Sequence, residues 1–176
     1  MNIFFKIDLK KALNFILYVS ENYPTFNIYL ISLLIYSADK KHLLSYGSPI
    51  IGDNYIAMKC GPIPSTVYDI IRISRGYDVI FDKDFVKLVR DSLAINNNMI
   101  QIKIQSDQDY FSKIEKEIVK KYGDFFIGKT FEQARNCTCD RAYNKTIQND
   151  LISYGDILDE SEHKDEILAY IKEYTL

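Results

Sequence analysis

Residues 47–64 read Gly-Ser-Pro-Ile-Ile-Gly-Asp-Asn-Tyr-Ile-Ala-Met-Lys-Cys-Gly-Pro-Ile-Pro, and the prediction of the fold starts from this stretch. The turn-forming triplet Gly-Asp-Asn at 52–54 lies between two short β-prone pieces, 50–51 and 55–59. This order predicts a small β-hairpin that turns at 52–54. The Gly-Pro pair at 61–62 is expected to end the hairpin, because glycine tolerates positive φ and proline suits the start of a following helix.

The residues before this stretch predict two helices. Asp8 is a suitable cap for the first helix, whose apolar residues recur on one stripe at Leu9, Leu13, Ile16 and Leu17. Pro24 separates this helix from a second one over about 27–45. The second helix is apolar nearly all round in its first half and polar from Asp39 onward, so we expect it to be central and buried.

The residues after this stretch predict a third helix, a short fourth helix and a second hairpin. The third helix has its inward-facing residues at Val67, Ile70 and Ile71. Gly76 is expected to stop it, and a short helix is expected at 84–90. The three asparagines at 96–98 predict a turn between the segments 93–95 and 99–104, the second of which alternates as a strand does.

Three further helices are predicted from their caps. A capping-box pattern at 106–109 precedes an apolar stripe that is expected to end at Gly123. A second pattern at 130–133 caps a helix to about residue 137, and Ser161 is expected to begin a last amphipathic helix. The fold class predicted is therefore α+β and mostly α-helical, a compact helical domain with one or two small β-hairpins.

The composition fits one soluble domain over residues 1–176, with 47% hydrophobic and 26% charged residues. The start of the chain has no signal-peptide pattern, and the longest apolar run, 28–38, is shorter than the ~20 residues that span a bilayer. Three cysteines without framework spacing suit a reducing cytosol, so we expect a cytoplasmic protein with no membrane partner. The abundance of Ile, Asn, Lys and Tyr is typical of an AT-rich bacterial or phage genome.

The formal net charge of -2 and the pI of about 5.7 argue against non-specific binding to nucleic acid, which needs a basic surface. A small local basic patch is still compatible with this charge. The chain has 14 tyrosines and no tryptophan. Tyrosine is enriched at protein interfaces, and the same excess also follows from the genomic bias, so both explanations stay open.

Two consecutive motifs resemble those of a known family. Residues 33–43 read Leu-Leu-Ile-Tyr-Ser-Ala-Asp-Lys-Lys-His-Leu, which is similar to the LLYFAD-x-x-HL helix of the Panacea-domain (SocA-like) antitoxins. Residues 47–64 are similar to the family's G-x-P-I-x-GD-x-Y-x-AM-x-x-GPVP hairpin. The motif residues in this chain are Asp39, His42, Gly52, Gly61, Pro62 and Pro64. The resemblance covers about residues 30–75 well.

The resemblance implies an antitoxin that is encoded beside a variable toxin and neutralises it by direct binding in a hetero-oligomeric complex. The toxins of such proteins belong to unrelated classes, including small alarmone-synthetase-like pyrophosphokinases and membrane-acting peptides. One branch of the family instead works as an adaptor that delivers its toxin to a protease. This chain departs from the family where a histidine usually precedes an Ala-Trp pair, because Thr138 precedes Ala142 and Tyr143 here.

Asp39 and His42 stand at i and i+3 on one face of the predicted second helix. They are the starting point for an enzyme, because histidine titrates near neutrality and a carboxylate can fix its tautomer. We favour a buried polar tie between helix and hairpin, because no nucleophile or third group is evident. A DNA-binding regulator is the other alternative, and the chain lacks a helix-turn-helix pattern to support it.

Metal and phosphate sites are not expected. Cys137 and Cys139 are closer in sequence than the cysteines of most structural zinc sites, and only His42 and His163 are available to complete a set of four ligands. The glycines of the hairpin lack the neighbouring Gly-rich run and Lys-Ser/Thr pair of a phosphate loop. We therefore predict no catalytic residue, no metal and no cofactor.

Exposed tyrosines with charged neighbours are the expected toxin contacts, because aromatic rings supply contact area at low entropic cost and charges set register. The candidates are Asp53, Tyr55, Lys59, Tyr68, Arg72 and Tyr143. The alternative for Tyr55 and Tyr68 is packing against their own helices. A different interface remains open on the helix at 108–122 or on the acidic segment 156–173.

Overall fold

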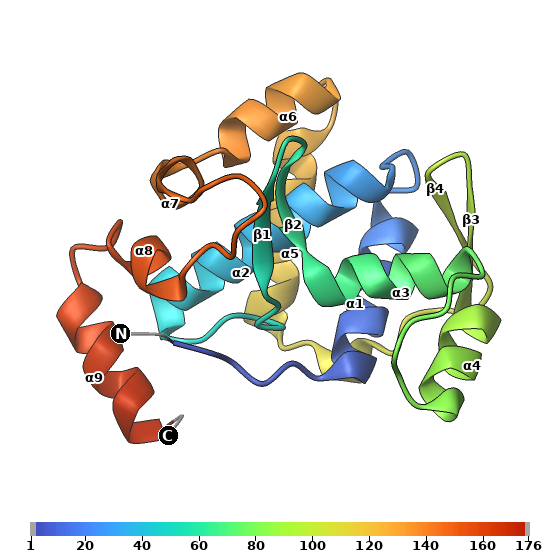
Figure 1. Ribbon diagram of the computed structural model, residues 1–176, viewed down its shortest axis with the longest axis horizontal. Helices are drawn as coiled ribbons and strands as arrows, with labels where there is room; N and C mark the ends of the chain where they lie inside the picture. The colour runs from blue at the N-terminus through green and yellow to red at the C-terminus, as the bar shows by residue number, and fades with distance from the viewer. Residues whose placement is uncertain (1–2, 175–176) are drawn as a thin grey trace.

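In the computed structural model, which describes residues 3–174, helix α2 (Ile28–Tyr46) runs through the middle of the molecule (Figure 1). Asn27 caps its start by accepting hydrogen bonds from the backbone N–H groups of Tyr29 and Leu30. Gly47 ends it in the left-handed conformation with φ of 77°. Most of its residues are buried on all sides, as predicted for the central helix.

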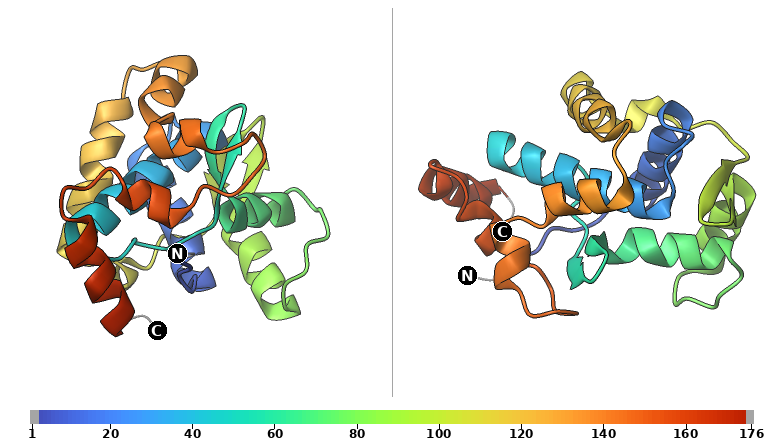
Figure 2. Two further views of the ribbon diagram at one scale, coloured as in Figure 1. Left: turned by 60° about the vertical axis from the view of Figure 1, so that its left-hand side comes forward. Right: turned by 90° about the horizontal axis from the view of Figure 1, so that it is seen from above.

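The other elements surround α2. The first half of the chain forms α1 (Leu9–Asn22), β1 (Tyr55–Met58), β2 (Gly61–Pro64), α3 (Ser65–Ser74), α4 (Lys83–Ser92), β3 (Leu93–Asn96) and β4 (Met99–Ile102). The second half forms the 3-10 turn η1 (Gln108–Tyr110), α5 (Lys113–Phe126), α6 (Phe131–Thr138), α7 (Arg141–Lys145), α8 (Tyr154–Leu158) and α9 (Lys164–Tyr174). Over residues 3–174 these are nine α-helices and two antiparallel strand pairs, which confirms the predicted mostly helical α+β class. Figure 2 shows α5 on one side of α2, with α6 and the first hairpin on the other.

The first hairpin lies further along the chain than predicted. Strand β1 pairs with β2, with Tyr55 opposite Pro64 and Met58 opposite Gly61, so the turn is at residues 59–60. The Gly-Pro pair at 61–62 therefore begins the second strand and does not follow the hairpin. The outer edge of β1 is covered by residues 149–152, which exchange backbone hydrogen bonds with it.

The second hairpin and its flanking helix form as predicted. Strands β3 and β4 pair through a turn in which Asn97 and Asn98 both have positive φ, a conformation that asparagine tolerates better than most residues. Helix α3 ends two residues before Gly76, which has φ of 87°. Asp82 caps α4.

Helix α5 differs from the prediction at both ends. Its capping box is Ser112 with Glu115, whereas Ser106 of the predicted box donates hydrogen bonds to the carboxylate of Glu21. Gly123 lies inside the helix and does not end it. A Cβ at Gly123 would lie 1.9 Å from Cζ of Tyr23, so glycine is required there for the close approach of Tyr23, the C-cap residue of α1, to α5.

The two other helices predicted in this half of the chain start close to their predicted caps, whereas α7 and α8 were not predicted. Thr130 and Gln133 form the predicted capping box of α6. The last helix starts at Lys164, three residues after Ser161, and buries Ile167 and Ile171. These two residues belong to a second apolar cluster that includes Tyr36, Tyr55 and Tyr154, separate from the main core around α1, α2, α3 and α5.

Candidate functional site

Asp39 joins the central helix to the segment that leads into the hairpin. The side chain is fully buried, and its Oδ1 accepts the N–H groups of Ile50 and Ile51 at 2.9 Å each. Its Oδ2 accepts the N–H of Gly52 at 2.9 Å and the hydroxyl of Tyr55 at 2.8 Å. Burial raises the pKa of Asp39 to about 6, against the hydrogen bonds, which lower it. The polar tie between helix and hairpin is therefore confirmed.

His42 lies on the same helix but takes part in a different contact. Its Nδ1 is 2.5 Å from the carbonyl oxygen of Ser48, and its ring packs against Tyr46. Asp39 uses both of its oxygens for the hydrogen bonds of residues 50–55. The two side chains thus each hold backbone of the connecting segment, and no hydrogen bond joins them among the described residues.

Asp53 caps α3 from outside the helix. Pro64 occupies the N-cap position and makes no side-chain hydrogen bond there. The carboxylate of Asp53 instead accepts the N–H groups of Thr66 at 3.0 Å and Val67 at 2.9 Å. Asp53 is 1% exposed, and burial raises its pKa. The role of Asp53 is to fix the start of α3 relative to the hairpin.

The predicted toxin contacts separate into buried and accessible residues. Asp53 and Tyr55 are each 1% exposed, so the expectation that these side chains are exposed is wrong. The prediction treated polar side chains as exposed. The polar atoms of these two side chains instead have hydrogen-bond partners inside the fold. Lys59 and Tyr68 are exposed, and Arg72 is half-buried. Tyr143 is half-buried, and its hydroxyl donates to the carbonyl of Met58 at 2.7 Å.

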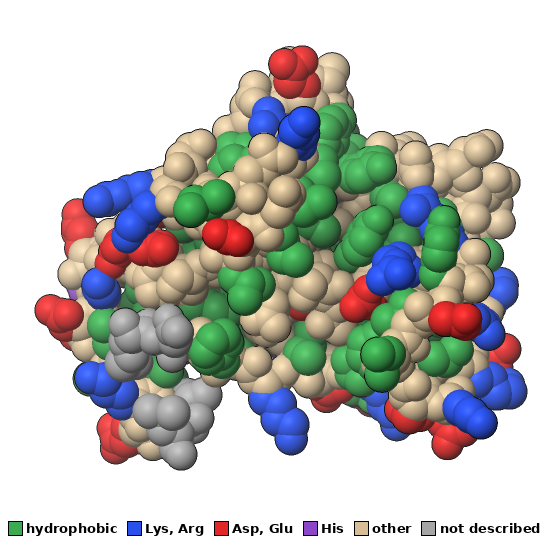
Figure 3. Space-filling model, in the orientation of Figure 1, with side chains coloured by type: hydrophobic (Ala, Val, Ile, Leu, Met, Phe, Trp, Pro, Cys, Tyr) green, Lys and Arg blue, Asp and Glu red, His purple; other side chains and the backbone are tan. Residues whose placement is uncertain are grey.

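An apolar groove lies between the start of α2, the hairpin and α3. It consists of two adjoining hollows with volumes of about 470 Å³ and 630 Å³, which share Tyr29, Met58 and Cys60. Figure 3 shows hydrophobic side chains gathered on this face between the hairpin and α3. The floor includes the buried Ile63 and Ile71, and Tyr68 forms part of the wall. We define these two hollows together as the hairpin groove.

Most of the chain matches the model of one protein family. The family model described as "Antitoxin SocA-like, Panacea domain" matches residues 33–174. The chain belongs to the Panacea-domain, SocA-like antitoxin family. Searches among curated proteins and among solved structures gave no significant match.

The motif residues of this Panacea domain shape the corner between α2 and the hairpin. Gly52 and Gly61 have φ of 69° and 106°, where side chains other than glycine are strained. A Cβ at Gly61 would lie 2.7 Å from Cδ2 of Leu33, so this strand packs directly on α2. With Asp39 and Asp53, these glycines account structurally for the motif on which the resemblance rests.

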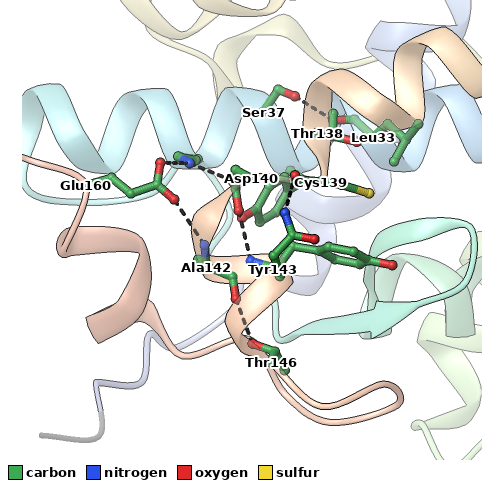
Figure 4. A network of polar contacts seen from close by, with 12 residues as sticks. Leu33, Ser37, Thr138, Cys139, Asp140, Ala142, Tyr143, Thr146 and Glu160 are labelled. Carbon is green, nitrogen blue, oxygen red and sulfur yellow. Dashed lines mark hydrogen bonds and ion pairs between the residues drawn. The ribbon is translucent and has the colours of Figure 1, made fainter.

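Thr138, where the sequence is expected to depart from the family pattern, lies at the end of α6 (Figure 4). It is 2% exposed, and its hydroxyl donates to the carbonyl of Arg135 at 2.9 Å. The side chain therefore closes the last turn of its own helix. In this member of the family, the position has no titratable group.

A polar network beside Thr138 ties α7 and α8 of the Panacea domain to α2 (Figure 4). Asp140 accepts the hydroxyl of Tyr36 at 2.8 Å and pairs with Lys40 at 2.5 Å. Lys40 also pairs with Glu160 at 2.5 Å, and Glu160 accepts the N–H of Ala142 at 3.1 Å. Sequence reasoning missed this network, because partners about 100 residues apart leave no local pattern. The ammonium of Lys40 lies between two carboxylates, and both carboxylates also accept hydrogen bonds from neutral groups of the same network, which marks it as structural.

Two further features of residues 3–174 are the grouping of side chains that bind metal ions and the length and apolar character of the helices. This part of the Panacea domain contains no group of three or more His, Cys, Asp or Glu side chains placed to hold a metal ion. Burial raises the thiol pKa of Cys60 and of Cys139, which disfavours the reactive thiolate. No helix in the described range has the length and apolar character required to cross a membrane.

Proposed function

We propose that this Panacea-domain protein neutralises its cognate toxin by direct stoichiometric binding and catalyses no reaction. The family is antitoxin-like, which supports a toxin as the partner. The observation that carries the binding mechanism is the hairpin groove, an accessible apolar surface that includes Lys59 and Tyr68. Exposed apolar surface of this kind is typical of protein contact sites.

The arrangement of the titratable groups supports binding over catalysis. Asp39 and Asp53 are buried and bonded to backbone N–H groups of their own chain, so neither faces a substrate. His42 contacts the backbone carbonyl of Ser48. A general base must reach the proton that it removes, and these contacts occupy the groups that would do so.

Small alarmone-synthetase-like pyrophosphokinases are one of the unrelated toxin classes that the family resemblance implies. We extend the proposal to that class, in which bound antitoxin would block access of nucleotide to the toxin. The readout is pyrophosphate transfer by the toxin in the presence and absence of this protein.

The test is co-expression with the product of the neighbouring open reading frame. We expect restored growth, a complex that survives size-exclusion chromatography, and full neutralisation only at a molar equivalent of antitoxin. Neutralisation at a small fraction of an equivalent would indicate catalysis and contradict the proposal. A fall in toxin level on co-expression would indicate delivery to a protease instead of sequestration. The exposed variant Lys121→Glu serves as the control for expression level.

A further inference from the structure

Positively charged side chains predominate among the unpaired charges around the hairpin groove. Lys59 lines one hollow and Arg75 lines the other, so each hollow of the groove has a cation in its lining. Neither cation has a carboxylate partner within residues 3–174. Asp69 is the only carboxylate in the lining, and Arg72 pairs with it at 3.1 Å. Each hollow therefore has one cation without a carboxylate partner, although the whole chain carries a net charge of -2.

The walls of the groove offer aromatic surface with unused hydroxyl groups. Tyr29 and Tyr68 both line it, and the hydroxyl of neither has a hydrogen-bond partner in the described part of the chain. Tyr68 is 44% exposed, and Met58 beside it is 37% exposed. Tyrosines of this kind supply apolar contact and a polar tip together, which is the chemistry of many binding hot spots.

The geometry excludes one common mode of peptide capture. Strand β1 already bonds residues 149–152 along its outer edge, and β2 contains two prolines, which lack the N–H that strand pairing needs. A partner segment therefore cannot extend this sheet and must bind through side chains. Apolar side chains fit the floor, and carboxylates beside them complement the two cations.

We propose that the hairpin groove receives an apolar segment of the toxin that is flanked by acidic side chains, which pair with Lys59 and Arg75. This inference rests on the proposed function and specifies the chemistry of its contact. The charges set orientation and the speed of association, while Tyr68 and the apolar floor supply most of the affinity.

The experiment measures binding kinetics of the purified product of the neighbouring open reading frame to four variants. Tyr68→Ala should weaken the equilibrium affinity about 30-fold, the effect of a typical hot spot. Lys59→Glu and Arg75→Glu should each slow association about tenfold at low salt, and raised salt should reduce the difference. Tyr68→Phe keeps the ring and should lose much less affinity than Tyr68→Ala.

Two exposed positions outside the groove serve as matched controls. Lys121→Glu makes the same charge change on α5, and Tyr77→Ala removes another exposed tyrosine. Both should bind as the wild type does, and thermal unfolding establishes that every variant is folded.

Faster association by Lys59→Glu, or wild-type affinity in all four groove variants, would overturn the inference while leaving neutralisation intact. Absence of any complex with the wild type would instead refute the proposed function itself. Self-association or RNA binding that depends on these residues, without effect on the toxin, would also overturn the inference.

Discussion

Replacing Gly123 by alanine should destabilise the fold, although the same change usually stabilises a helix. Alanine in a helix interior is favoured over glycine by about 1 kcal/mol. Here the added Cβ would lie 1.9 Å from Cζ and 2.2 Å from Cε2 of Tyr23, well inside van der Waals contact. Tyr23 stacks on Phe26, and its hydroxyl donates to the carbonyl of Lys120. The ring must therefore leave its place or force α5 away from it.

The size of the destabilisation follows from the apolar burial and the hydrogen bonds that Tyr23 loses. Displacing Tyr23, which is 7% exposed, forfeits about 2–3 kcal/mol of apolar burial and about 1 kcal/mol for its hydrogen bonds. Subtracting the gain in helix propensity leaves a net loss of about 2–3 kcal/mol in the free energy of unfolding. For a chain of this length, that loss should lower the Tm by about 4–12 °C.

The assay is urea unfolding followed by circular dichroism, in three backgrounds at position 23. In wild type and in Tyr23→Phe, Gly123→Ala should destabilise, because the ring atoms that obstruct the Cβ are present in both. In Tyr23→Ala the obstruction is gone, so the sign should invert and Gly123→Ala should stabilise by about 0.5–1 kcal/mol. A stabilising effect in the wild-type background would refute the reasoning.

Three further outcomes are expected. Gly61→Val should lower the Tm, because Gly61 has φ of 106° and its Cβ would lie 2.7 Å from Cδ2 of Leu33; an unchanged Tm would contradict this. Burial raises the pKa of Asp39 to about 6, above its unfolded value of 3.8, so folding favours the protonated form. Relative to Asp39→Asn, the wild type should therefore lose roughly 3 kcal/mol of unfolding free energy as pH rises from about 4 to 6, and parallel pH profiles would count against it. Elemental analysis of the purified protein should find no stoichiometric zinc, and one zinc per chain would redirect attention to Cys137 and Cys139.

The fold was predictable from sequence where local chemistry decides it. The caps at Asp8 and Thr130 and the turn at Asn97 each involve residues within a few positions of one another, and the structure places them as predicted. The first hairpin was misplaced because Asp39 binds the N–H groups of residues 50–52, a long-range contact that removes them from strand pairing. Gly123 was misread for a similar reason, since its role depends on Tyr23 of a different helix.

The candidate site was predictable only in part. The motif located the hairpin and α3, and the accessible residues Lys59 and Tyr68 were among those chosen from sequence. Burial of Asp53 and Tyr55 could not be read from their chemistry, because a buried polar group is distinguished by its partners and not by its type. Arg75 was missed, because only the folded chain brings it to the same groove as the hairpin.

The two buried aspartates bear on how such a protein can change its partner over evolutionary time. Asp39 and Asp53 bind mainly backbone N–H groups, which every residue except proline provides whatever its side chain. Substitutions in the segment they hold therefore leave the hydrogen bonds in place, provided that glycine is kept where φ is positive. The residues that form this frame differ from those of the proposed contact surface. Surface side chains that would contact a new toxin can therefore be substituted while the hydrogen-bonded backbone beneath them is retained.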